Sequence, residues 1–449
     1  MKNKIFALIG SGLLFLTSCE KYLDKKSDQK LVVPQTVAEL QAVLDDNTLF
    51  NQNEPNAVIV AADEYQLSYA AWQGLNEFSR NMYIWAPALQ FASTASDNWS
   101  VLYTQVYRAN VVLTNLPNVA EQGFQEWRNV KGQALMLRSK AFFQALMIWT
   151  VGYQASTSAN EPGIPIRLDV NFNTTSIRSA QKECFLKVID DLRESAALLP
   201  DIPVHPIRPS KPAAYGYLAR TFLAMGMADS CLKYTNLALA LKGSLMDYNG
   251  GPGVNPTAEY PFARFNPEVI YDTYMGHPTS VSNGVIDPEL YNSYAADDLR
   301  KVRFHRSSTS IGYFKGSYYG TFDLFNGIAT DELYLNRAEC YARLGDKTRS
   351  IEALNTLLLK RFKTGTFQPY TAIDSEEALK KVLTERKKEL VFRGLRWMDL
   401  KRLNADGADI TLKRVLSGKE YMLLPNDRGY AMPIPEKVIS TSGMAQNLR

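Results

Sequence analysis

The sequence predicts a mostly α-helical protein, in which helix pairs form a scaffold with long loop inserts, few short strands and a single large domain. Three observations lead to this prediction. Apolar residues recur at three-to-four spacing in many segments, these segments follow one another in pairs, and strand patterns are scarce. The composition, with 46% hydrophobic and 21% charged residues among 449, is ordinary for a soluble globular protein. It excludes intrinsic disorder, collagen and a polytopic membrane protein.

The helices are predicted in chain order from their apolar stripes. In 97–116, for example, Leu102, Val106 and Ala109 lie on one face, and Pro117 stops the helix. The same spacing predicts helices over 130–151, 183–199, 210–227, 228–241, 330–344, 347–362 and, with a break at Gly394, 376–403.

The pair beginning at residue 330 carries a pattern of its own. Ala338-Glu339-Cys340-Tyr341-Ala342 followed by Leu344-Gly345-Asp346 resembles the tetratricopeptide repeat, in which small residues let two helices approach closely and glycine ends the first helix. A plain array would repeat every ~34 residues. Here long inserts rich in Gly, Pro, Asn and aromatic residues separate the pairs, at 47–96, 152–179 and 249–325. We interpret these inserts as functional surface carried on a tetratricopeptide-like scaffold.

The first residues are typical of a bacterial lipoprotein signal. Two lysines precede an apolar stretch, 5–16, which is too short for a bilayer because a spanning helix needs about 20 apolar residues. The stretch ends in Leu16-Thr17-Ser18-Cys19, which resembles a lipobox. We expect residues 1–18 to be removed and Cys19 to carry acyl chains that anchor the protein. An ordinary signal peptide with an incidental cysteine is the alternative.

Neither a nucleic-acid site nor a metal or cofactor site is predicted. The 50 basic and 46 acidic residues give a net charge of only +4, which does not indicate a surface that binds nucleic acid. The histidines show no metal-ligand spacing and are expected to face solvent in loops; they are His205, His277 and His305. Besides Cys19, an odd number of thiols lies in separate helical patterns, which predicts apolar packing rather than disulfides; these are Cys184, Cys231 and Cys340.

The C-terminal quarter carries the most specific motif. Residues 385–403 spell ERKKELVFRGLRWMDLKRL, which is similar to the E-R-x-x-E-L-x-x-x-G-x-R-x-x-D-L-x-R signature of the SusD/RagB family of nutrient-binding outer-membrane lipoproteins. The matching residues are Glu385, Arg386, Glu389, Leu390, Gly394, Arg396, Asp399, Leu400 and Arg402. Arg393 departs from the family, which often has an acidic residue there. Met432-Pro433-Ile434-Pro435 and Gln446-Asn447 are similar to the family's closing elements.

The resemblance implies both a fold and a function. The mature chain would comprise an N-terminal region, 19–228, and a C-terminal region, 229–449, of one helical domain at the outer-membrane surface. It would bind a glycan or another nutrient oligomer without catalysis and hand it to a TonB-dependent, SusC-like β-barrel transporter that it covers as a lid. We interpret the signature as a fold mark whose charged residues tie the last helices to the rest.

Two insert regions mix aromatic rings with polar groups, and this mixture suits sugars. Sugar C–H faces stack on rings, while the hydroxyls need amide, carboxylate or guanidinium partners. The first region offers Tyr65, Trp72, Tyr83, Trp85, Asp97, Asn98 and Trp99. The second offers Tyr291, Tyr294 and Tyr313, with Arg306 nearby. The alternative is that these rings fill a core between inserts and scaffold or pack on the transporter.

Two other classes of function compete with the nutrient binder. A glycoside hydrolase needs two facing carboxylates about 5 to 10 Å apart, and 46 acidic residues leave that possibility open. The sequence has no G-x-S-x-G, H-E-x-x-H or phosphate-loop motif. The third class is a helix-pair scaffold that only docks proteins.

Overall fold

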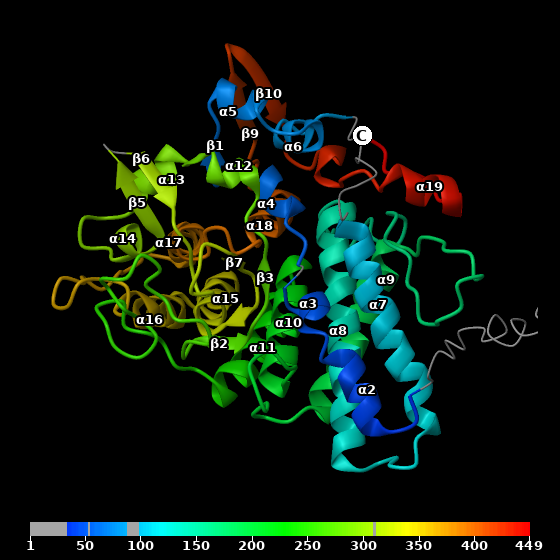
Figure 1. Cartoon of the computed structure of the whole chain (residues 1–449). Helices are drawn as coiled ribbons and strands as arrows, with labels where there is room; N and C mark the ends of the chain where they lie inside the picture. Colours follow the sequence, from blue (N-terminus) through cyan, green and yellow to red (C-terminus); the bar gives the residue numbers. More distant parts are fainter. Residues whose placement is uncertain (1–33, 53, 88–97, 309–310) are drawn as a thin grey trace, which may run out of the picture.

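Helices form the scaffold of the protein, as the sequence predicts (Figure 1). The computed structural model describes residues 34–52, 54–87, 98–308 and 311–449. Every predicted helix is present, and most of them have one or both ends shifted. The long helices are α7 (Asn98–Asn115), α8 (Gln125–Trp149), α9 (Gln181–Leu198), α10 (Lys211–Ala224), α11 (Ala228–Leu241), α15 (Thr330–Arg343), α16 (Lys347–Leu358), α17 (Ser375–Glu389) and α18 (Arg396–Ala405).

Successive helices pack against one another like the pairs of a tetratricopeptide array. Each helix from α7 to α10 packs on the next, and α11 packs on α15, which contacts both α16 and α17. Gly132 shows how closely α8 and the end of α9 approach. A Cβ at this position would lie 2.9 Å from Cγ of Leu199, so a larger residue would push the two helices apart. The short helix α2 (Val37–Leu44) packs on α7 and α8.

The first and third inserts contain regular structure that the sequence pattern did not predict. Elements of only two to seven residues have too little length for an apolar period to stand out. The first insert contains α3 (Asn47–Phe50), α4 (Ala57–Ala61), β1 (Tyr65–Gln66), α5 (Tyr69–Gln73) and α6 (Glu77–Tyr83). The third contains β2 (Val269–Tyr271), β3 (Tyr274–Met275), α12 (Thr279–Ser282), β4 (Val285–Ile286), α13 (Pro288–Ser293), α14 (Arg300–Phe304), β5 (His305–Ser308), β6 (Ile311–Phe314) and β7 (Leu324–Phe325).

The strands form antiparallel two-stranded pairs. The pairs are β1 with β4, β2 with β8 (Ile328–Ala329), β3 with β7, β5 with β6, and β9 (Leu412–Leu416) with β10 (Lys419–Leu423). In the first pair Tyr65 lies opposite Ile286, which joins the first insert to the third. The chain closes with α19 (Glu436–Ser442). The prediction of few, short strands is confirmed.

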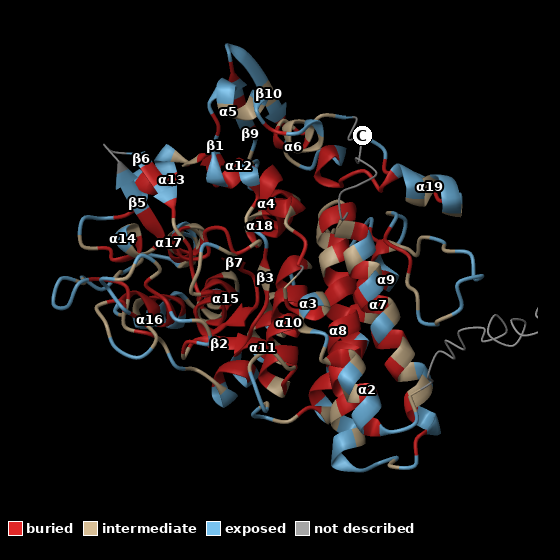
Figure 2. Ribbon diagram, viewed as in Figure 1, coloured by how far each residue is buried: buried red, intermediate tan, exposed pale blue. Residues whose placement is uncertain are grey.

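One core extends through the scaffold and into the inserts (Figure 2). Its apolar side chains come from α4 and α8 as well as from strands β2, β7 and β8. Helix α8 is buried over most of its length, which places Lys140 in the interior. There its ammonium pairs with Glu54 and donates to the Phe50 carbonyl at 2.6 Å. Among the described helices, none has the length and apolar character needed to cross a bilayer.

Candidate ligand-binding site

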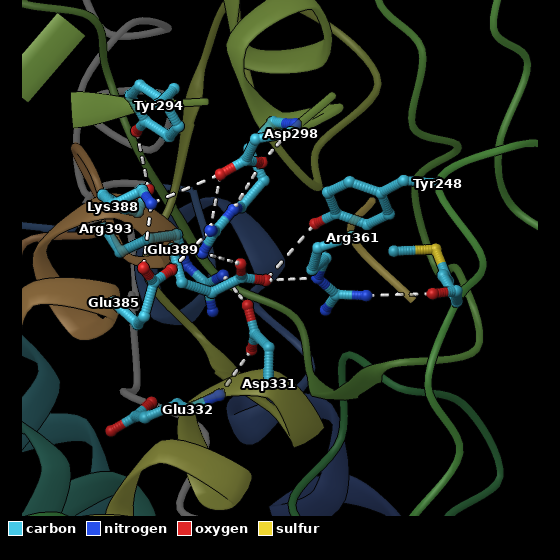
Figure 3. Close-up of polar contacts among 12 residues, drawn as sticks. Tyr248, Tyr294, Asp298, Asp331, Glu332, Arg361, Glu385, Lys388, Glu389 and Arg393 are labelled. Atoms are coloured by element: carbon cyan, nitrogen blue, oxygen red, sulfur yellow. Dashed lines mark hydrogen bonds and ion pairs between the residues drawn. The ribbon is translucent and has the colours of Figure 1, made fainter. Parts of the chain in front are cut away.

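The signature segment is buried in a network of ion pairs (Figure 3). Glu389 of α17 accepts hydrogen bonds from Arg361 at 2.7 Å and from Arg300 at 3.2 Å. Glu385, one turn earlier, also pairs with Arg300. Arg361 reaches both oxygens of Glu268, at 2.9 and 3.0 Å. Burial raises the pKa of Glu268 to about 7, although the positive charge of Arg361 acts to lower it. The network joins α17 to the third insert and to the segment that follows α16.

The second half of the signature makes a similar set of contacts. Asp399 of α18 accepts hydrogen bonds from Arg386 and from Arg402, both at 2.8 Å. Arg402 also binds Glu339 of α15 at 2.8 Å. Although burial acts to raise it, the pKa of Glu339 falls to about 2 because Arg402 lies against it. Arg396 completes the set with two hydrogen bonds to Asp63, at 2.7 and 2.8 Å.

Arg393, the departure from the family pattern, has its own partner. Its guanidinium lies 2.9 Å from Asp331 and 4.5 Å from the ring centre of Phe325. The following Gly394 has a φ of +74°, a backbone conformation that glycine adopts without strain. A Cβ there would lie 3.2 Å from Cε of Met275. The signature segment therefore holds helices together, because its charged groups form ion pairs with other parts of the protein.

Three aromatic candidates of the first insert surround Arg414 from β9. The guanidinium lies 3.5 Å from the ring centre of Tyr83, and the rings of Tyr65 and Trp85 lie 5.4 and 5.0 Å away. All three rings are buried. The Tyr83 hydroxyl accepts a hydrogen bond from the Leu67 backbone at 2.8 Å, so this polar group is already satisfied. Ligand contact by these residues stays a prediction.

The other candidates of the first insert are scattered. Trp72 is half-buried, and its indole N–H donates to the Arg80 carbonyl at 3.1 Å. Asn98 accepts from the backbone N–H of Ala57 at 3.1 Å. Trp99 is buried against Trp149, with ring centres 4.7 Å apart. Asp97, like the lipid-attachment residue Cys19, lies outside the described residues.

Two of the three candidates in the third insert surround a buried histidine. Tyr291 and Tyr294 are buried beside His305, with ring centres 5.7 and 5.3 Å from the imidazole. The Tyr294 hydroxyl donates to the Lys388 carbonyl at 2.8 Å. The expectation that His305 faces solvent is wrong, because strand β5 turns this residue toward the core. Burial lowers the pKa of His305 to about 3.

Tyr313, the remaining candidate, opens onto a cavity of about 580 Å³ beside the β5–β6 hairpin. It lies opposite Arg306 in the ladder, and both side chains are exposed. On another wall, Nδ1 of His277 lies 3.0 Å from the Ser282 hydroxyl, and the imidazole packs edge-on against the Phe322 ring. The walls include Tyr260, His277, Ser282, Arg306, Tyr313 and Phe322.

This cavity offers what a sugar needs. Exposed rings can stack on apolar sugar faces, while guanidinium, imidazole and hydroxyl groups can bind sugar hydroxyls. Burial lowers the pKa of His277, so its ring is uncharged near neutral pH and can both donate and accept. Tyr260, His277 and Phe322 were not among the site residues predicted from the sequence. Their position in the aromatic-rich insert 249–325 was the available signal, and only the packing of α12 near the hairpin brings them together.

A second hollow, of about 470 Å³, runs between α13, α17 and α18. Its lining includes the aliphatic residues Leu290, Leu383 and Leu403. Polar side chains such as Glu289, Lys380 and Thr384 line it as well, but none of the described residues that line it has an aromatic ring to stack on a sugar face. The cavity beside the hairpin is therefore the better candidate site.

Comparison with known protein families identifies the class of the protein. A family model described as "Starch-binding associating with outer membrane" matches residues 21–223, and the SusD family model matches residues 330–448. The chain belongs to the SusD/RagB family, as the signature predicts. No curated protein matched the sequence.

Solved structures share the fold of this chain. A SusD superfamily protein from Bacteroides thetaiotaomicron is 18% identical, with a TM-score of 0.72 over 92% of this chain and 100% of that chain. A SusD-like carbohydrate binding protein from Bacteroides vulgatus is 17% identical, with a TM-score of 0.66 over 91% and 97%. A laminarin binding SusD-like protein is 16% identical, with a TM-score of 0.62 over 91% and 98%. These similarities establish the helical fold.

Proposed function

We propose that this protein binds a glycan in the cavity beside the β5–β6 hairpin and releases it unchanged to a TonB-dependent transporter. One observation carries the proposal. The cavity combines the exposed rings of Tyr313 and Phe322 with Arg306, and none of the described residues that line it is a carboxylic acid. The carbohydrate and laminarin binding of the two SusD-like relatives supports this choice of ligand class.

The lining also favours binding over hydrolysis. Glycoside hydrolysis needs a proton donor and a second carboxylate on either side of the scissile bond. The described lining instead supplies rings, an imidazole, hydroxyls and a guanidinium. A sugar held by these groups would be oriented and partly desolvated, but no group would be placed to cleave it.

Ring truncation tests the binding site. We expect Tyr313→Ala and Phe322→Ala each to weaken glycan affinity by about tenfold, which corresponds to about 1.4 kcal/mol of stacking energy. Phe124→Ala is the matched control, because Phe124 is an exposed ring outside this cavity. Calorimetric titration against a glycan panel, together with product analysis, provides the readout. Turnover would indicate a hydrolase, and unchanged affinity in both cavity variants would place the ligand elsewhere.

The membrane location forms part of the same proposal. We infer that Cys19 carries a lipid that holds the protein at the outer membrane beside its transporter, and the outer-membrane association of the first matching family supports this location. Cys19→Ala should abolish fractionation with the outer membrane, and the unaltered protein should co-purify with a TonB-dependent barrel from solubilised membranes. Pelleting of the Cys19→Ala variant with the outer membrane would contradict the lipid anchor.

A further inference from the structure

The charge on the cavity wall comes from one exposed arginine. The Arg306 side chain is 58% exposed. Its one ion-pair partner among the described residues is Glu259, whose carboxylate lies 3.2 Å from the guanidinium and is equally exposed. Exposed ion pairs contribute about 0 to 1 kcal/mol. An anion on a ligand can therefore take over the Arg306 guanidinium with little loss of existing interactions.

Two further cations, Lys315 and Arg303, lie near Arg306. Lys315 follows Tyr313 by two positions, and its backbone N–H continues the hairpin ladder to the Phe304 carbonyl at 2.9 Å. Because side chains alternate along a strand, Lys315 is directed to the same side as Tyr313. Arg303 donates only to backbone carbonyls, those of Tyr248 and Pro256, within the described structure.

These cations repel one another. Burial lowers the pKa of the Lys315 ammonium, and the positive charges of Arg303 and Arg306 lower it further, while Glu259 opposes them. In the described part of the chain the Lys315 ammonium makes neither an ion pair nor a hydrogen bond to a side chain. One carboxylate, that of Glu259, therefore faces three cations, of which Arg306 lines the cavity and Lys315 and Arg303 lie next to it.

The opposite wall does not offset this charge. His277 is neutral because burial lowers its pKa, with Asp323 opposing the shift. Asp323 accepts a hydrogen bond from the Thr321 hydroxyl at 3.0 Å and is absent from the lining of the cavity. Positive charge is thus concentrated on the hairpin, beside the Tyr313 ring.

We propose that the ligand is an anionic oligosaccharide, whose carboxylate or sulfate binds Arg306 and Lys315 while a neighbouring sugar ring stacks on Tyr313. This inference rests on the proposed function of the cavity as a glycan site. The planar guanidinium fork matches the paired oxygens of either anion. The uncompensated charge also attracts an anionic chain as it approaches the cavity.

Three probes distinguish the kinds of ligand. An oligogalacturonide carries only carboxylates, a carrageenan oligosaccharide carries only sulfates, and a laminari-oligosaccharide is neutral. Calorimetric titration should show at least one anionic probe binding ten times more tightly than the neutral probe. This advantage should shrink between about 0.05 M and about 0.5 M NaCl, because salt screens exposed charges.

Charge-removing variants test the assigned residues. Arg306→Gln and Lys315→Gln should each reduce the preference for the anionic probe at least threefold, with the fold checked by circular dichroism. Arg349→Gln is the matched control, because Arg349 is 61% exposed and ion-paired with Asp346 on α16. It should keep the full preference.

The possible outcomes separate the two proposals. A neutral probe that binds as tightly as both anionic probes would overturn the anionic assignment and still support a glycan site. Failure of all three probes to bind would overturn the proposed function as well. A preference that survives both Arg306→Gln and Lys315→Gln would overturn the assignment of these residues.

Discussion

Two arginines in this protein are each accompanied by aromatic rings, and the two groups differ in what the guanidinium faces. Arg414 is 6% exposed, lies against Tyr83 and Trp85, and donates to the Ala62 carbonyl at 2.6 Å. Arg306 is 58% exposed, lies opposite Tyr313 in the hairpin, and has a weakly held partner in Glu259. Side-chain chemistry is alike in both groups. Solvent access and unused hydrogen-bonding capacity separate a structural cluster from a binding site.

The largest expected difference between the groups is in stability. We expect Arg414→Ala to lower the free energy of unfolding by about 3 to 5 kcal/mol, because buried carbonyls lose their donor and a void opens among the rings. Arg306→Ala should change it by less than about 0.5 kcal/mol. Urea denaturation measures both values. Equal stabilities for the two variants would show that Arg414 is no more structural than Arg306.

Truncation of rings sharpens the same comparison. Trp85→Ala should lower the free energy of unfolding by about 3 to 5 kcal/mol, because the indole is 8% exposed and donates to the Ala61 carbonyl at 3.0 Å. Phe322→Ala, which removes a ring that is 52% exposed, should instead mainly weaken glycan affinity. Thermal denaturation and glycan titration are measured on both variants. A folded Trp85→Ala protein with normal stability and lost glycan affinity would extend the ligand site to the first insert.

A pH titration tests the carboxylate of Glu64, which precedes Tyr65 of the buried cluster around Arg414. Glu64 accepts a hydrogen bond from the Phe392 backbone at 2.8 Å, its second oxygen has no partner among the described residues, and burial raises its pKa to about 8. The raised pKa means that the folded state binds the proton more tightly than the unfolded state does. Its contribution to stability is therefore complete below about pH 4.5 and is lost as pH rises through about 8.

Glu64→Gln keeps the neutral shape and should remove this dependence on pH. The free energy of unfolding of the unaltered protein should fall more steeply between pH 6 and pH 9 than that of the variant, by at most ~1.4 kcal/mol per pH unit. Urea denaturation across this range measures the difference. Parallel curves for the two proteins would show that Glu64 is ionised in the folded state.

The smallest expected effect concerns the exposed group around Arg306. Glu259→Gln removes the carboxylate that competes for Arg306 and should raise the affinity for an anionic oligosaccharide by about two- to threefold, because exposed pairs are weak. Stability should stay within about 0.5 kcal/mol of the unaltered protein. Titration at low salt measures the change. A drop in affinity would instead make Glu259 a ligand-binding residue.

Periodicity predicted the long helices well because each buries an apolar stripe of many residues. Helix α11 spans the predicted 228–241, and α15 begins at the predicted residue 330. The signature segment was equally visible, since its charged residues stand at fixed spacings along the chain. Short elements of the inserts were not visible. His305 shows the consequence, because it was expected to face solvent in a loop, whereas the register with Phe314 turns it inward.

The sequence by itself determined the helical class, the family and the inserts in which a ligand site could lie. Tertiary structure decided which aromatic residues of these inserts are buried and which line a cavity. The physical reason is that a helix is specified by neighbours three and four positions apart, whereas the cavity depends on contacts between distant segments. Tyr313, His277 and Phe322 meet only because the third insert folds back on itself.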